Sequence, residues 1–178
     1  MLLFERGGAE PVARFDFPRQ PGDDGLGLAD FVRPIGHTTR DSVCLFVTTA
    51  GEGVRARYEA WKAAGEYLKS HVVQALAVET AEAAAEWLHA KLRGHWGFPD
   101  APTATMADRF QTRHRGRRYS FGYPACPNLD DQAKLFQLLA PEEIGVTLTE
   151  GFMMEPEASV SALVVHHPDA SYFTVGTV

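Results

Sequence analysis

The chain has 178 residues, of which 45% are hydrophobic and 22% are charged, and its net charge is −6. This length and balance are typical of a single folded domain and exclude wholesale disorder. The net acidity argues against a nucleic-acid partner, and no apolar run reaches the roughly 20 residues of a membrane helix. There is no signal-peptide pattern, and Cys44 and Cys126 lie too far apart for a zinc or redox motif. We therefore expect a cytoplasmic protein with reduced thiols and no membrane partner.

The first third of the chain predicts an arm, a strand and a helix. Prolines and glycines interrupt residues 1–34, and we expect residues 1–25 to form an extended N-terminal arm. Residues 42–48 are apolar and β-branched, which indicates a buried strand. A glycine turn then leads into a helix that carries Val54 and ends near Gly65.

A long helix over about residues 66–93 is the clearest predicted element. Two of its faces are apolar, one of them formed by Leu68, Val72, Leu76, Ala83 and Trp87. The polar residues, among them Glu82, His89 and Arg93, form a narrow strip. Because a helix that is apolar on most sides is usually buried, we expect this helix to be central to the domain.

The remainder of the chain predicts one further helix and three strands. A glycine and two prolines in residues 119–127 forbid a regular helix there. A short amphipathic helix is expected over about 129–139, and strands are expected at 146–149, 159–165 and 172–175. This order of elements predicts an α+β fold: a single domain with a long central helix, further helices and an antiparallel sheet or meander.

Taken alone, the polar residues leave the chemistry open. Glu82 is most simply a solvated charge on a helix. Arg118 precedes Gly122, where the backbone could closely approach a carboxylate bound to the arginine fork. Glu86 and His89 have the Glu-x-x-His spacing of di-iron bundles, but a second such pair is missing, so the favoured interpretation is two helix-surface residues. We expect no catalytic residue and no metal ligand.

One segment resembles the signature of a known family. Residues 118–127, Arg-Tyr-Ser-Phe-Gly-Tyr-Pro-Ala-Cys-Pro, are similar to the Arg-x-x-x-Gly-Tyr-Pro-Ala-Cys-Pro signature of the activation domain of cobalamin-dependent methionine synthase. The resemblance covers nearly everything from about residue 26, and it implies that residues 26–178 form this domain. The other segments that resemble the family, in its order, are 28–31, 47–51, 81–89, 145–150, 156–161 and 167–173.

The resemblance implies a function in reactivation. In this family a cobalamin carries methyl groups to homocysteine and is occasionally oxidised to inert cob(II)alamin. The activation domain binds S-adenosylmethionine (SAM), docks on the cobalamin-binding domain and supplies a methyl group, while flavodoxin or a similar reductase supplies an electron. The chain would then be part of a methyltransferase and would not be catalytic without a cobalamin domain. The alternative is a stand-alone module of the same fold that serves another corrinoid protein.

The resemblance also implies which residues bind SAM. Arg118 would pair with the α-carboxylate, and Glu82 would receive the α-ammonium group. Gly122 and Ser120 would provide close main-chain contacts. Tyr123 would lie near the sulfonium and the corrin, where an aromatic face favours a cation.

Three further positions complete this comparison. Tyr172 and Phe173 match an aromatic pair near the nucleoside. Arg33 stands where some members carry an aspartate that contacts SAM, so this contact is not expected here, and the neighbouring Asp30 is expected to have a structural role.

Overall fold

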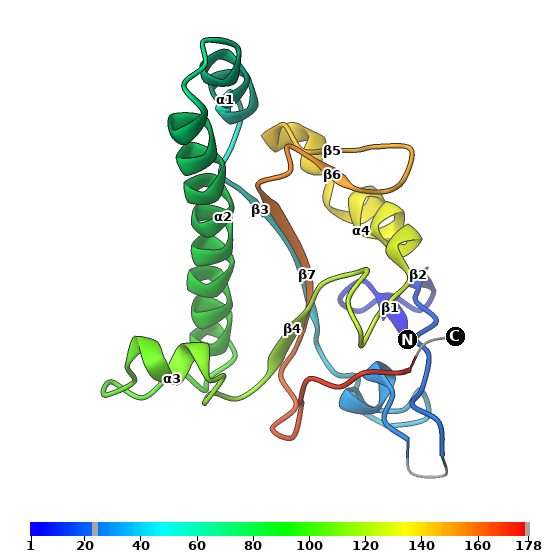
Figure 1. Cartoon of the computed structure of the whole chain (residues 1–178). Helices are drawn as coiled ribbons and strands as arrows, with labels where there is room; N and C mark the ends of the chain where they lie inside the picture. Colours follow the sequence, from blue (N-terminus) through cyan, green and yellow to red (C-terminus); the bar gives the residue numbers. More distant parts are fainter. Residues whose placement is uncertain (23–24, 177–178) are drawn as a thin grey trace.

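The computed structural model describes residues 1–22 and 25–176 and is organised around a three-stranded antiparallel sheet in the order β3-β7-β4 (Figure 1). The middle strand, β7 (Ser159–Val165), pairs with β3 (Cys44–Thr49) on one side and with β4 (Arg117–Tyr119) on the other. Its residues after Ser159 are all buried, which explains their continuous apolar character. The sheet therefore joins segments that are distant in sequence.

The two faces of β7 contribute to two separate hydrophobic cores. Val160, Ala162 and Val164 pack on the side of the long helix, whereas Leu163 and Val165 belong to the larger core on the opposite side. This alternation follows the two-residue period of a strand. The same period places neighbouring residues of β4 on different faces.

The long helix α2 (Tyr67–His95) lies against one face of the sheet, as Figure 1 shows. It follows α1 (Val54–Ala63), and Gly65, with a φ of 77°, turns the chain between the two helices. The predicted long helix and the α+β fold are thus confirmed. None of the helices in the described part of the chain has the length and apolarity needed to cross a bilayer.

The burial of α2 differs from the expected pattern. Ala77, Ala81 and Ala85 are buried, and the same row continues to His89 and Arg93, which are 1% and 0% exposed. The expectation of a polar strip at His89 and Arg93 is therefore wrong. Residues four apart form one face of a helix, and small side chains let that face approach the sheet most closely. The residues expected to be apolar and buried but found exposed are Leu68, Val72, Leu76, Ala83 and Trp87.

The opposite face of the sheet is covered by α4 and by the N-terminal segment (Figure 1). The predicted arm, of which residues 23–24 lie outside the described residues, is not only extended: residues 1–22 contain the strands of a hairpin, and Phe15 is fully buried against Phe121 with ring centroids 5.6 Å apart. The elements on this side are β1 (Leu2–Phe4), β2 (Pro11–Arg14), the 3-10 helices η1 (Leu28–Phe31), η2 (Leu129–Asp131) and η3 (Pro141–Ile144), and α4 (Gln132–Leu139).

Two predicted strands differ from the structure. The expected strand at 146–149 is shorter, β5 (Thr147–Leu148), and it pairs with β6 (Met154–Glu155). The strand expected at 172–175 is absent from the described residues: this segment is held by single contacts, including the bond from the Val175 N–H to the Pro124 carbonyl (3.2 Å). A short helix that the sequence analysis did not predict, α3 (Met106–Phe110), precedes β4.

Candidate functional site

A pocket of about 460 Å³ lies between α2, the turn that follows β4 and the C-terminal segment. This volume is within the range of roughly 300–1,000 Å³ typical of small-molecule sites. It is lined by six of the seven residues that the sequence analysis proposes for SAM, namely Glu82, Arg118, Ser120, Tyr123, Tyr172 and Phe173. The seventh, Gly122, lies in the same turn without lining the pocket.

The pairing of β4 with β7 decides where Arg118 points. Arg118 is opposite Val164 and so lies on the face of the sheet covered by α2, whereas Tyr119 is opposite Leu163 and is buried in the other core. The register therefore brings the guanidinium of Arg118 to α2. A slip of one residue would reverse both side chains.

The turn after β4 shapes the wall of the pocket. The Gly122 N–H donates to the Cys126 carbonyl (2.9 Å), and the Cys126 N–H donates to the Tyr123 carbonyl (2.9 Å). Gly122 has a φ of 83°, a conformation that glycine adopts readily. The Ser120 hydroxyl donates to the Ser161 carbonyl (2.8 Å) and ties the turn to β7.

Cys126 has a structural role in this turn. Its thiol is buried and donates to the Ser120 carbonyl (2.8 Å). Burial, the largest cause, raises the pKa of the Cys126 thiol to about 12, so the group stays protonated. This agrees with the interpretation of Cys126 as a buried residue and not as a nucleophile.

Arg118 and Glu82 form an ion pair at the edge of the pocket. The Arg118 Nη2 donates to the Glu82 Oε2 at 3.0 Å, and the Glu86 carboxylate lies 4.0 Å from the same nitrogen. The Arg118 Nη1 is buried and has no hydrogen-bond partner. The pair thus combines the Arg118 guanidinium, which has an unused donor, with the Glu82 carboxylate, an acceptor whose side chain is 48% exposed.

Aromatic side chains from two segments form the rest of the pocket. Tyr172 packs edge-to-face on Tyr119 with centroids 5.6 Å apart, and the Tyr119 hydroxyl donates to the Ser171 carbonyl (2.7 Å). Burial raises the pKa of both phenols, which therefore remain neutral. Tyr123 and Tyr172 are more than half exposed and offer free ring surface to a ligand.

Six other residues line the pocket but are not among those predicted from the sequence. Tyr119, Pro124, Ala125 and Cys126 fall inside the signature at 118–127, so the motif itself was a signal for them. Val160 lies outside the signature, in the family-like segment 156–161, and Thr174 lies outside every such segment; the sheet register and the path of the C-terminal segment bring them here.

The N-terminal position that departs from the family lies elsewhere. Arg33 lines a different cavity, between the N-terminal hairpin and the segment before β3. The neighbouring Asp30 pairs with Arg19 through both carboxylate oxygens and accepts the Gly27 N–H (2.9 Å). Hydrogen bonding from Arg19 lowers the pKa of Asp30, consistent with the structural role expected for this residue.

Comparisons with known proteins show the family of this chain. A family model described as "Vitamin B12 dependent methionine synthase, activation domain" matches residues 8–178. Methionine synthase of Mycobacterium leprae is 36% identical in an alignment of 186 residues, and this alignment covers 98% of the chain. That of Mycobacterium tuberculosis is 37% identical over 173 residues, which cover 91% of it. The chain spans only 15% and 14% of the length of these two relatives.

A solved structure gives the same result. It is described as the MetH reactivation domain bound to AdoHcy. The match covers 91% of this chain and 52% of the solved chain, with a TM-score of 0.83 and 34% sequence identity. The agreement of sequence, fold and family model leads to one conclusion: this chain belongs to the family of the activation domain of vitamin B12-dependent methionine synthase.

Proposed function

We propose that this chain is the SAM-binding reactivation domain of a cobalamin-dependent methionine synthase, a homocysteine methyltransferase. When bound, SAM supplies a methyl group that, with an electron from flavodoxin or a similar reductase, converts cob(II)alamin on a partner domain to methylcobalamin. The residues of this chain bind SAM and orient it toward the cobalamin-binding domain on which the chain docks. The observation that carries the proposal is the gathering of six residues around one pocket in a member of this family, three from the signature and three from the family-like segments 81–89 and 167–173.

The ion pair of Arg118 and Glu82 matches the amino-acid end of SAM. The α-carboxylate of SAM needs a pair of hydrogen-bond donors, and the neighbouring α-ammonium group needs an acceptor. The Arg118 guanidinium supplies the donors and the Glu82 carboxylate supplies the acceptor, 3.0 Å from it. The unpartnered Nη1 of Arg118 is a donor already removed from water. A carboxylate that binds there satisfies a buried group that otherwise costs about 1–3 kcal/mol.

The aromatic residues suit the other end of the ligand. Tyr172 and Phe173 line the pocket and offer flat surfaces to an adenine. The exposed ring of Tyr123 favours a sulfonium cation, an interaction of about 0.5–1 kcal/mol at exposed sites. Ser120 and Gly122 hold the main chain of the turn in place beside the ligand.

The proposal assigns the binding function to residues 26–178 and a supporting role to the arm, residues 1–25. All the pocket residues lie in the first range. The arm contributes Phe15 to the core beneath the signature segment, where it packs on Phe121. The arm therefore stabilises the pocket without touching the ligand.

Calorimetric titration with AdoHcy and with SAM tests the pocket. Arg118→Ala is expected to weaken binding of both by about 1.5–3 kcal/mol, the range for hydrogen bonds to charged groups, which is roughly 10–150-fold in affinity. Arg113→Ala is the matched control, because Arg113 is exposed, pairs with Asp108 and does not line the pocket. Equal affinities in Arg118→Ala and wild type would overturn the proposed site.

A reconstitution experiment tests the reaction. The chain is mixed with a separate cobalamin domain in the cob(II)alamin form, SAM and a reductant, and the visible spectrum is followed. Conversion to the spectrum of methylcobalamin supports the proposal, and Arg118→Ala should slow it. Binding of SAM without conversion, with the cobalamin domain of a methionine synthase as partner, favours a stand-alone module for another corrinoid protein instead.

A further inference from the structure

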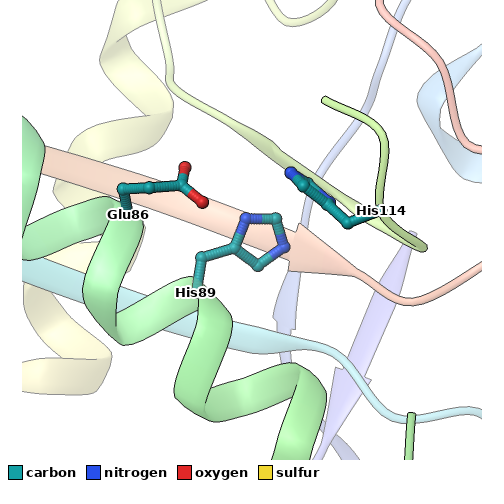
Figure 2. Close-up of side chains that lie close together, drawn as sticks. All are labelled: Glu86, His89 and His114. Carbon is teal, nitrogen blue, oxygen red and sulfur yellow. The ribbon is translucent and has the colours of Figure 1, made fainter. Parts of the chain in front are cut away.

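Three potential metal ligands lie together beside the pocket without lining it. Figure 2 shows Glu86 and His89 on α2, with His114 approaching them from the loop between α3 and β4. One ligand atom of each residue lies within 4.8 Å of the others. Glu86 and His89 share a face because they are three residues apart on a helix. The fold supplies the third residue from a distant part of the sequence.

Two atoms of this cluster are buried and have no hydrogen-bond partner. His89 is 1% exposed and its Nε2 is unpartnered, as is the Oε1 of Glu86. The Arg93 Nη2 lies 3.6 Å from Glu86 Oε1, which is an ion-pair distance but too long for a hydrogen bond. Buried polar groups in folded proteins are almost always satisfied, so such exceptions point to a missing partner.

Both imidazoles are suited to accept a metal ion. Burial, followed by the charges of Arg93, His114 and Arg118, lowers the pKa of His89 to about 3. Burial is also the largest cause that lowers the pKa of His114. A neutral imidazole offers a lone pair to a metal ion, and the buried, unpartnered Nε2 of His89 beside the other two side chains is the geometric reason to look for an ion here.

Several of the guanidinium groups around the cluster are held in ion pairs. Arg93 is held by Asp100 through two hydrogen bonds of 2.6 and 2.7 Å, and Arg118 is paired with Glu82. Arg109 also faces Asp100, at 3.7 Å. These ion pairs reduce the repulsion that the guanidinium groups exert on a cation, and the Glu86 carboxylate, which faces Arg93 at 3.6 Å and Arg118 at 4.0 Å, adds a negative charge to the cluster.

We propose that Glu86, His89 and His114 bind a divalent transition-metal ion, with Zn²⁺ as the preferred ion. Two imidazoles and one carboxylate are a donor set found in zinc sites that keep the fourth position open for water. Ligand atoms around tetrahedral zinc are about 3.3 Å apart, given Zn–N and Zn–O bonds of about 2.0–2.2 Å. The ligand atoms now lie within 4.8 Å of one another, so metal binding requires the three side chains, one of them on a loop, to move closer together.

Calorimetric titration of the chelator-treated chain with Zn²⁺ tests this site, and the visible absorption of bound Co²⁺ reports four-coordinate geometry. We expect one tight ion per chain. Loss of a residue that only hydrogen-bonds to a metal ligand lowers metal affinity by about 10–100-fold. His114→Ala and Glu86→Gln each remove a direct ligand, so each should lower the Zn²⁺ affinity by more than this. Both variants keep α2 intact, because His114 lies in a loop and glutamine is isosteric with glutamate.

The matched control is His71→Ala, which removes an exposed histidine from the same helix. It should leave the Zn²⁺ affinity and the Co²⁺ spectrum unchanged. Wild-type affinity in both His114→Ala and Glu86→Gln, or the absence of Zn²⁺ binding by the folded wild-type chain, would overturn the site. In that case the cluster is a polar packing contact, in which His89 and His114 stack edge-to-face at 5.1 Å. Because no SAM or AdoHcy is used, this outcome is independent of the proposed function.

Discussion

Gly122 is the residue on which the shape of the pocket wall depends most directly. Its φ of 83° is strained for any residue with a Cβ, and a Cβ built there would lie 3.0 Å from the Cδ1 of Leu129. Gly122→Ala should therefore destabilise the fold by more than about 1 kcal/mol and weaken binding of AdoHcy. Urea unfolding and calorimetry measure the two effects.

Gly145→Ala separates strain from crowding. Gly145 has a φ of 77°, but a Cβ there meets nothing within 4 Å, so this variant reports the cost of the backbone conformation alone. We expect it to leave AdoHcy binding unchanged. If Gly122→Ala behaves like Gly145→Ala in both measurements, the turn adapts to a side chain and does not limit the pocket.

Asp100 gives the protein an identifiable sensitivity to acid. Hydrogen bonding from the buried Arg93 is the largest cause that lowers the pKa of Asp100. A lowered pKa in the folded state means stability that is present above the unfolded pKa of about 4 and is lost as the pH falls through the lower folded value. Asp100→Asn should thus be less stable than wild type at pH 7, with a smaller difference at about pH 3 by urea unfolding. A difference that does not shrink would show that the charge of Asp100 is unimportant.

Single residues also show where prediction from sequence reaches its limit. Arg118 and Gly122 were identifiable because they belong to one contiguous signature. His114 was not, since it lies in an arginine-rich stretch and meets Glu86 and His89 only through the fold. The sequence pattern predicts a polar strip that contains His89 and Arg93, but polarity does not require exposure, because Arg93 is neutralised by Asp100 inside the protein.

At the scale of elements, α2 shows that hydrophobicity and burial are different properties. Its length was predictable from composition, but its buried face was not, because close packing on a sheet selects small residues. Ala81 is 1% exposed and Leu76 is 62% exposed. The strand expected at 172–175 failed for a related reason: its apolar residues pack through side chains and lack a neighbouring strand.

A pair of substitutions on α2 tests this assignment of faces. Ala81→Leu adds volume where the helix meets Phe46 and should cost about 1–3 kcal/mol of unfolding free energy. Leu76→Gln, with similar helix propensity, should change it by less than about 0.5 kcal/mol. Urea unfolding followed by circular dichroism provides both values. A larger loss for Leu76→Gln than for Ala81→Leu would mean that the helix is packed the other way round.

At the scale of the whole molecule, stability depends on contacts between distant segments. The middle strand β7 comes last in the order of strands, so the sheet cannot close before nearly the whole chain is present. The core opposite α2 likewise joins Phe15 near the start, Phe121 in the signature and Val165 in β7. Local patterns predict such elements, but the side chains that meet across them are decided by the register and by the path of the connections.

Phe15 is the place to test whether the arm supports the pocket. It is fully buried, and Phe121, which it contacts, belongs to the same turn as Ser120 and Gly122. Phe15→Ala should cost about 3–5 kcal/mol of unfolding free energy, and AdoHcy affinity should fall as the turn loosens, although Phe15 does not line the pocket. Val12→Ala, at a half-exposed position of the same arm, should cost less than about 0.5 kcal/mol and leave binding unchanged. Should Phe15→Ala lose stability yet bind AdoHcy as tightly as wild type in calorimetry, the arm stabilises the core alone and the pocket is organised by residues 26–178.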